Sequence, residues 1–270
     1  MAIWLQAALW GLLAGSALLI GAGLGYFMRI PDRVVAGIMA FGSGVLISAL
    51  SFELVEEAYN QGGFSATAIG FVAGAVIYSG ANWILTHKGA KHRKRSNGTQ
   101  PSEQEDAGSG LALAIGALID GIPESIVIGL GLIGGANVSM VTVIAIFLSN
   151  IPEGLSSAVG MKKANRSLRY VFLLWGSIAI ASGIASWLGY SFLSGYSPEV
   201  LAGITAIAAG AILSMLADTM IPEAFEKVHN FTGLIMVAGF LTAYLLSKME
   251  SGGDDSQTVA FWSEIVISYL

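Results

Sequence analysis

The sequence predicts an all-α membrane protein that crosses the bilayer many times. Apolar stretches of about 20 residues recur along the chain, each long enough to cross a hydrocarbon core about 30 Å thick. Only 11% of the 270 residues are charged, whereas a soluble domain has roughly 25%. The basic residues gather at alternate connections between the apolar stretches. We therefore expect eight transmembrane helices, with the N- and C-termini outside and no separate soluble domain.

The predicted elements divide the chain into four parts. Residues 1–86 hold the first three spans, 87–109 form a cytoplasmic basic and polar loop, 110–247 hold the other five spans, and 248–270 form an extracytoplasmic tail. The loop is too polar to bury a core, so we expect it to be disordered. With no cysteine, the chain has neither disulfides nor thiolate ligands. The predicted spans are 3–28, 34–58, 64–85, 111–133, 138–159, 170–193, 200–221 and 231–245.

The charge pattern fixes the expected orientation. Cytoplasmic connections of membrane proteins are enriched in lysine and arginine. With the N-terminus outside, every basic residue except Lys248 falls on the cytoplasmic side, a pattern that an odd number of spans would break. His87 and His92 lie in the basic loop, either as a cytosolic metal sensor or beside charges that set topology against anionic lipid. The inner basic residues are Arg29, Arg33, Lys88, Lys91, Arg93, Lys94, Arg95, Lys162, Lys163, Arg166, Arg169 and Lys227.

Small residues recur on single helix faces, as in Gly21-Ala-Gly-Leu-Gly25 and Gly70-Phe-Val-Ala-Gly74. Such faces allow helices to approach closely in lipid. They indicate ordinary close packing, or alternatively sliding between helix groups or dimerisation.

A Pro-Glu pair interrupts an apolar span three times. In the fourth span, Asp120 and Glu124 are four residues apart and share one helical face. Pro123 has no N–H, so it frees the carbonyl near Ile119 and bends the helix. Two carboxylates and a carbonyl then point toward one place. Carboxylates inside a membrane usually line a polar pathway, so this motif indicates the passage of a cation.

The fifth span repeats the motif with different partners. Ser149 and Asn150 precede Glu153 by four and three residues, and Pro152 frees the carbonyl near Leu148. Two facing helices of this kind would form a cage of oxygen ligands, which suits a divalent cation whose charge offsets the carboxylates. The alternative is that the prolines are hinges and the glutamates are protonated packing residues. The repetition in adjacent spans favours the metal site.

Further acidic residues extend the predicted pathway. Glu53 and Glu57 share a face near the outer end of the second span and could form an entry relay, although solvated end residues are the alternative. The third motif copy, with Asp218, Pro222 and Glu223, lies near the inner end of the seventh span. We interpret it as an exit path and Pro222 as a third helix kink.

The motifs together resemble the ZIP family of divalent metal transporters, in its prokaryotic branch. Gly121-Ile-Pro-Glu-Ser125 and Asn150-Ile-Pro-Glu-Gly154 match the core of that family's paired motifs, and Gly42-Ser-Gly-Val-Leu-Ile-Ser48 followed by Glu53 also fits. The resemblance covers nearly the whole chain. It implies one or two metal sites between the fourth and fifth spans, with bridging glutamates at Glu124 and Glu153. It also implies a homodimer in which the first, fourth, fifth and sixth spans move against the others.

The sequence departs from this family at several ligand positions. The family's first histidine falls on Asp120 and the following asparagine on Gly121, while Ser149 and Asn150 hold the matching positions of the fifth span. All three histidines lie in inner loops, and the sixth span has no acid where the family often has a glutamate. A single, histidine-free site follows. Because oxygen ligands suit hard cations such as Mn²⁺, we expect less bias toward zinc than in histidine-bearing relatives.

These observations predict a divalent cation transporter of the cell membrane, working by alternating access. Zinc is the first expectation, then iron or manganese, with cadmium as a surrogate. We expect membrane lipid and metal ions as partners, no cofactor, no nucleic acid and no enzymatic activity. A non-transporting metal sensor or structural relative is the main alternative. An intramembrane protease or hydrolase is disfavoured because the spans hold no histidine and only Asp120 and Asp218 as aspartates.

Overall fold

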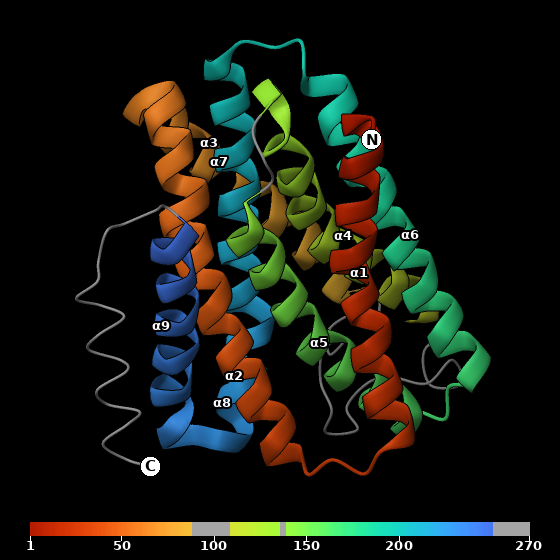
Figure 1. Cartoon of the computed structure of the whole chain (residues 1–270). Coiled ribbons are helices and arrows are strands. Elements are labelled where there is room, and N and C mark those ends of the chain that lie inside the picture. Colours follow the sequence, from red (N-terminus) through yellow and green to blue (C-terminus); the bar gives the residue numbers. More distant parts are fainter. Residues whose placement is uncertain (88–108, 136–138, 251–270) are drawn as a thin grey trace.

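The computed structural model describes residues 1–87, 109–135 and 139–250, and every regular element in these ranges is helical (Figure 1). The predicted all-α fold is thereby confirmed. Most of the expected loop 87–109 and of the expected tail 248–270 lies outside the described residues. The helices are α1 (Ile3–Phe27), α2 (Asp32–Ala49), α3 (Glu56–Leu85), α4 (Ser109–Leu130), α5 (Met140–Lys163), α6 (Leu168–Leu193), α7 (Pro198–Met215), α8 (Ile221–Val228) and α9 (Thr232–Glu250).

Six helical runs in the described residues are long and apolar enough to cross a membrane. Two of them, Asp32–Leu85 with 54 residues and Pro198–Met249 with 52, are each more than twice the roughly 20 residues that one crossing needs. Large apolar side chains face outward along the helices, including Ile69 and Val76 on α3 and Leu173 on α6. These lengths and exposed surfaces are those of a polytopic membrane protein.

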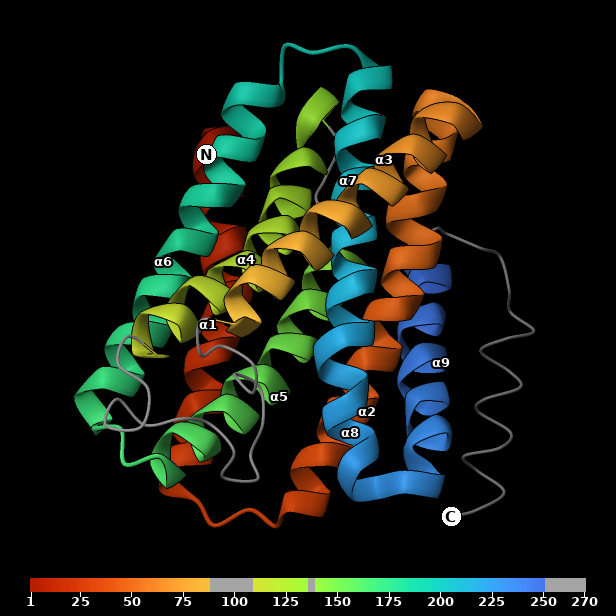
Figure 2. The same ribbon diagram turned by 180° about the vertical axis from the view of Figure 1, so that it is seen from behind.

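The first long run reverses direction without a loop. A π-helical segment, Leu50–Val55, joins α2 to α3, and the reversal comes at Gly63 inside α3, where φ is 70° and ψ is −178°. A positive φ is readily adopted by glycine, which has no Cβ. The sequence pattern predicts a break between residues 58 and 64, whereas the helix continues to Gly63 and turns there. Beyond this kink, α3 returns obliquely across the bundle (Figure 2).

The helices pack as two groups. In the first group, α1 packs most extensively against α5 and α6, and α4 packs against α6. In the second group, α3 packs against α7, and α2 packs against α9 and α8. The two groups meet mainly where α2 contacts α5 and where α4 contacts α7. This division matches the one that the ZIP resemblance implies for the moving and stationary spans.

Glycines bring the helices of each group into backbone contact. A Cβ at Gly21 of α1 would collide with the Ile151 carbonyl of α5, and a Cβ at Gly154 would collide with the Leu18 carbonyl. Similar contacts join α3 to α7, α2 to α9 and α4 to α6, so the small-residue faces serve close packing. For several of the described glycines, an added Cβ would lie closer than 3.0 Å to another helix. In each case the two helices belong to the same group. These glycines are Gly11, Gly15, Gly21, Gly25, Gly44, Gly62, Gly70, Gly74, Gly129, Gly154, Gly210 and Gly239.

The basic connections lie together at one end of the bundle. The α1–α2 connection, the α5–α6 connection and α8 share the end opposite the N-terminus and the α6–α7 connection (Figure 1). This basic end contains the connections that the charge pattern predicts to be on one side of the membrane. Its described lysines and arginines are Arg29, Arg33, Lys162, Lys163, Arg166, Arg169 and Lys227.

Candidate metal site

The predicted ligands of α4 are deeply buried. Asp120 is 1% exposed and Glu124 is 2% exposed. Pro123 lies inside α4 and removes one backbone donor at this point. Ser125 hydroxyl donates to the Gly121 carbonyl at 2.7 Å, which satisfies a backbone acceptor beside the proline. The helix thus continues through the motif while presenting two buried carboxylates.

Asp120 has a partner that the sequence motif does not contain. The hydroxyl of Tyr78 on α3 donates to Asp120 Oδ1 at 2.6 Å, and both side chains are buried. Because α3 belongs to the second group and α4 to the first, this hydrogen bond crosses between the groups. A single tyrosine in an apolar span resembles a core residue, so the sequence pattern does not reveal this contact.

The predicted ligands of α5 are also buried and are held by specific contacts. Asn150 donates from Nδ2 to the Ala14 carbonyl of α1 at 3.0 Å. The amide is therefore oriented so that Oδ1 is the end able to bind a cation. Ser149 donates to the Ile146 carbonyl at 2.9 Å and keeps its lone pairs for accepting. Glu153, 4% exposed, follows one turn later.

The described residues contain no group of three or more His, Cys, Asp or Glu side chains close enough to hold a metal ion together. Any cation bound at α4 and α5 would therefore draw on hydroxyl, amide or main-chain oxygens as well as carboxylates. Oxygen ligands of these kinds are compatible with divalent cations. The assignment of Asp120, Glu124, Ser149, Asn150 and Glu153 as ligands stays a prediction.

Helix α6 contributes a hydroxyl beside the α4 motif. A Cβ at Gly121 would lie 3.9 Å from Ser182 Oγ, and Ser182 is buried. The sequence pattern shows that this span lacks an acid, but it does not indicate that Ser182 faces Gly121. The α6 group nearest to Gly121 is therefore an uncharged hydroxyl.

The two acids predicted to form an entry relay have different surroundings. Glu53 lies in the π-helical segment after α2 and accepts hydrogen bonds from Ser247 at 2.6 Å and Ser139 at 3.2 Å. Glu57 is exposed and accepts from Gln61 at 2.9 Å. Ser139 also caps the N-terminus of α5. Glu53 thus connects α9 to the start of α5, whereas Glu57 faces outward.

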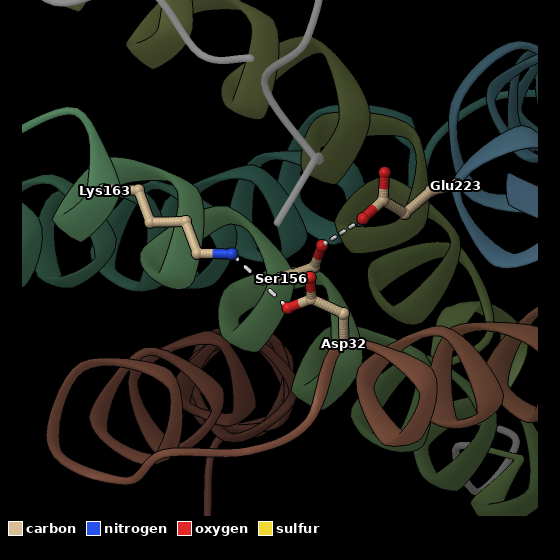
Figure 3. Close-up of polar contacts among 4 residues, drawn as sticks. All are labelled: Asp32, Ser156, Lys163 and Glu223. Carbon is tan, nitrogen blue, oxygen red and sulfur yellow. Dashed lines mark hydrogen bonds and ion pairs between the residues drawn. The ribbon is translucent and has the colours of Figure 1, made fainter. Parts of the chain in front are cut away.

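The predicted exit residues lie near the basic end of the bundle. Glu223 on α8 is 2% exposed and accepts a hydrogen bond from Ser156 of α5 at 3.1 Å (Figure 3). Asp218 lies in a second π-helical segment, Leu216–Met220, where it is exposed and accepts from Asn82 at 3.3 Å. Pro222 occupies the first turn of α8, a position that tolerates proline. It therefore begins a short helix after the π-helical segment.

An ion pair between α5 and α2 lies at the same basic end of the bundle. Lys163 of α5 lies 3.4 Å from Asp32 of α2, and both side chains are well exposed (Figure 3). An exposed pair of this kind contributes at most about 1 kcal/mol. It joins the two groups without holding them firmly.

Comparison with known proteins identifies relatives over most of the chain. A zinc transporter ZupT of Escherichia coli O7:K1 is 29% identical over 228 residues, covering 81% of this chain and 86% of that protein. A zinc transporter ZupT of Salmonella newport is 30% identical over 230 residues with the same coverage. No protein-family model matches the chain. With these relatives and its apolar helices, the chain is a multi-pass membrane transporter that belongs to the ZIP family of metal transporters.

Proposed function

We propose that this protein transports zinc across the cell membrane into the cytoplasm. The observation that carries the proposal is the set of three buried carboxylates, Asp120, Glu124 and Glu153, on two proline-bearing membrane helices. Buried charges in proteins are commonly paired or bind metal ions. The relatives are zinc transporters by name, which makes zinc the first substrate to test. Iron and manganese follow because every proposed side-chain ligand is an oxygen donor.

In the proposed site, Glu124 and Glu153 bind the ion directly. The three acids are not close enough in the described structure to hold one ion together, so the ion would draw the Asp120 carboxylate in as it binds. Ser149 and Asn150 complete the ligand set with neutral oxygens. The orientation of the Asn150 amide, with Nδ2 bonded to α1, supports this role for Oδ1. The prolines free carbonyl oxygens at the same depth, which could serve as additional ligands.

We further infer eight crossings, with both termini outside. The 54- and 52-residue runs are each long enough for two crossings, and the first has a sharp reversal at Gly63. The basic end would then face the cytoplasm. Because the chain has no cysteine, single cysteines can report this arrangement. Ser194→Cys should react with an impermeant thiol reagent added outside cells, and Asn165→Cys should react only after permeabilisation.

Alternating access would arise from movement of the first group against the second. Glycine contacts fasten the helices within each group, whereas the groups meet across an apolar cluster that contains residues of both, with hydrogen bonds and an exposed ion pair beside it. Polar contacts of this kind can be exchanged for others at small net cost. We also expect a homodimer, which chemical cross-linking in native membranes would detect.

Zinc uptake by the purified protein in liposomes containing a zinc-sensitive dye tests the proposal. Saturable uptake that needs no ATP, and that is absent from protein-free liposomes, is the expected result. Zinc binding by calorimetry on the same preparation distinguishes the alternative. A protein that binds zinc but gives no flux of zinc, cadmium, iron or manganese is a sensor, and the transport proposal would then be wrong.

A further inference from the structure

We propose that Tyr78 is a positioning residue of the metal site, supplied to Asp120 from the opposite helix group. Its hydroxyl holds Oδ1 of Asp120 and thereby directs Oδ2 to the ion. The inference rests on the proposed function, because it requires Asp120 to be a ligand. It adds a residue on α3 to a site that the sequence motifs confine to α4 and α5.

The geometry of the contact is that of a strong hydrogen bond. The 2.6 Å distance between Tyr78 Oη and Asp120 Oδ1 lies at the short end for O–H···O bonds, as expected when a carboxylate accepts. Tyr78 is 2% exposed and Asp120 is 1% exposed, so bulk water has little access to either side chain. Tyr78 also belongs to the largest apolar cluster, together with Met215 and Leu216, which fixes its ring. A rigid donor therefore restrains the rotation of the carboxylate.

Restraint of a ligand carboxylate has a known consequence for metal affinity. Groups that hydrogen-bond to metal ligands orient them, and their loss typically lowers metal affinity about 10- to 100-fold. Without the hydroxyl, Asp120 would sample orientations that do not face the ion. Zinc binding would then carry the entropic cost of ordering the side chain.

The contact also makes the orientation of the Asp120 carboxylate depend on how the two helix groups are arranged. Asn82 lies one turn beyond Tyr78 on the same face of α3 and donates to Asp218 at 3.3 Å. One face of α3 thus supplies donors to an aspartate of α4 and to an aspartate near the basic end. If α4 shifts relative to α3, the Tyr78 bond must break and Asp120 loses its restraint. Metal affinity at the site would then fall as the groups move, which favours release.

The test is a double-mutant cycle with zinc affinity as the readout. Calorimetry on purified full-length protein compares Tyr78→Phe, Asp120→Ala and the double variant with the wild type. Tyr78→Phe keeps the ring and its packing, and Tyr59→Phe, an exposed position on the same helix, is the matched control. We expect Tyr78→Phe to weaken zinc binding about 10- to 100-fold, to raise the KM of uptake by a similar factor, and to have no further effect in the Asp120→Ala background.

Each other outcome counts against the inference. Unchanged affinity in Tyr78→Phe would overturn it. An equal loss in both backgrounds would also overturn it, because the tyrosine would then act on the fold and not through Asp120. If Asp120→Ala leaves affinity unchanged while Glu124→Gln lowers it, this inference fails and the proposed function stands. If neither substitution lowers affinity, the proposed site itself is wrong.

Discussion

Ser156 on α5 donates a hydrogen bond of 3.1 Å to Glu223 on α8 and so joins the two helix groups near the basic end (Figure 3). Both side chains are buried. A carboxylate at this depth, between the α5 motif and the basic end, is placed to receive an ion that leaves the proposed site. The contact makes Glu223 the best-defined candidate for an exit ligand.

Neutralising Glu223 should slow transport without weakening the main site. Glu223→Gln keeps the shape of the side chain but removes the charge that would attract the departing cation. We expect a fall in maximal zinc uptake of roughly tenfold, equivalent to about 1.4 kcal/mol in the barrier, with zinc affinity by calorimetry unchanged. Glu226→Gln, on the same short helix and half-buried, is the control and should transport normally. Wild-type uptake by Glu223→Gln would remove this residue from the pathway.

The close approach of α1 and α5 should make Gly21 and Gly154 sensitive to any side chain. An alanine at either position must push apart two backbones in contact, and overpacking of this kind costs about 1–3 kcal/mol. Thermal unfolding in detergent should therefore show a clear drop in Tm for Gly21→Ala and Gly154→Ala. Gly176→Ala on α6 is the control, because its Cβ would meet nothing within 4 Å. Equal Tm values for all three variants would contradict the packing described here.

The selectivity of the site should follow its ligand type. With oxygen ligands alone, the wild type is expected to prefer Zn²⁺ over Mn²⁺ less strongly than a histidine-bearing site would. Asp120→His restores an imidazole, and we expect it to raise the ratio of zinc to manganese affinity at least about tenfold, or about 1.4 kcal/mol. Competition calorimetry measures both ions. A strong zinc preference in the wild type that survives Asp120→Ala would refute the oxygen-ligand site.

Restricting movement between the groups should stop transport. Asp32→Cys with Lys163→Cys replaces an exposed ion pair at the boundary, and the chain has no other cysteine. Cross-linking this pair with a short thiol reagent should abolish zinc uptake. Phe52→Cys with Tyr244→Cys, whose rings are 4.9 Å apart within the second group, should keep uptake after the same treatment. Full activity in the first cross-linked pair would show that these groups need not separate.

Much of the fold could be predicted from the sequence because each helix is a long apolar run. The predicted first span, 3–28, and sixth span, 170–193, differ from α1 and α6 by at most two residues at either end. The π-helical segments at Leu50–Val55 and Leu216–Met220 were not predicted, since nothing in their residues distinguishes a π-helical turn from an α-helical one. The break between residues 58 and 64 was predicted, but not that the helix continues as far as Gly63 before it reverses.

Only the residues of the site that belong to local sequence motifs could be predicted. Proline and carboxylate spacing identified the buried residues of α4 and α5, including Glu124 and Glu153. The partners Tyr78, Ser156 and Ser182 could not be found in the same way. Each is one of several hydroxyl residues in its helix, and only packing between distant segments gives it the polar neighbour described above. The burial of Glu223 likewise depends on α8 packing against α2.

The most direct measurement is zinc uptake into proteoliposomes by Glu124→Gln and Glu153→Gln beside the wild type. Each substitution keeps side-chain volume and removes a charge that the proposed site requires. Glu56→Gln, an exposed change, controls for reconstitution. We predict that uptake falls to the background of protein-free liposomes for Glu124→Gln and Glu153→Gln and stays at the wild-type level for Glu56→Gln. Normal uptake by both buried variants would contradict a metal site at α4 and α5.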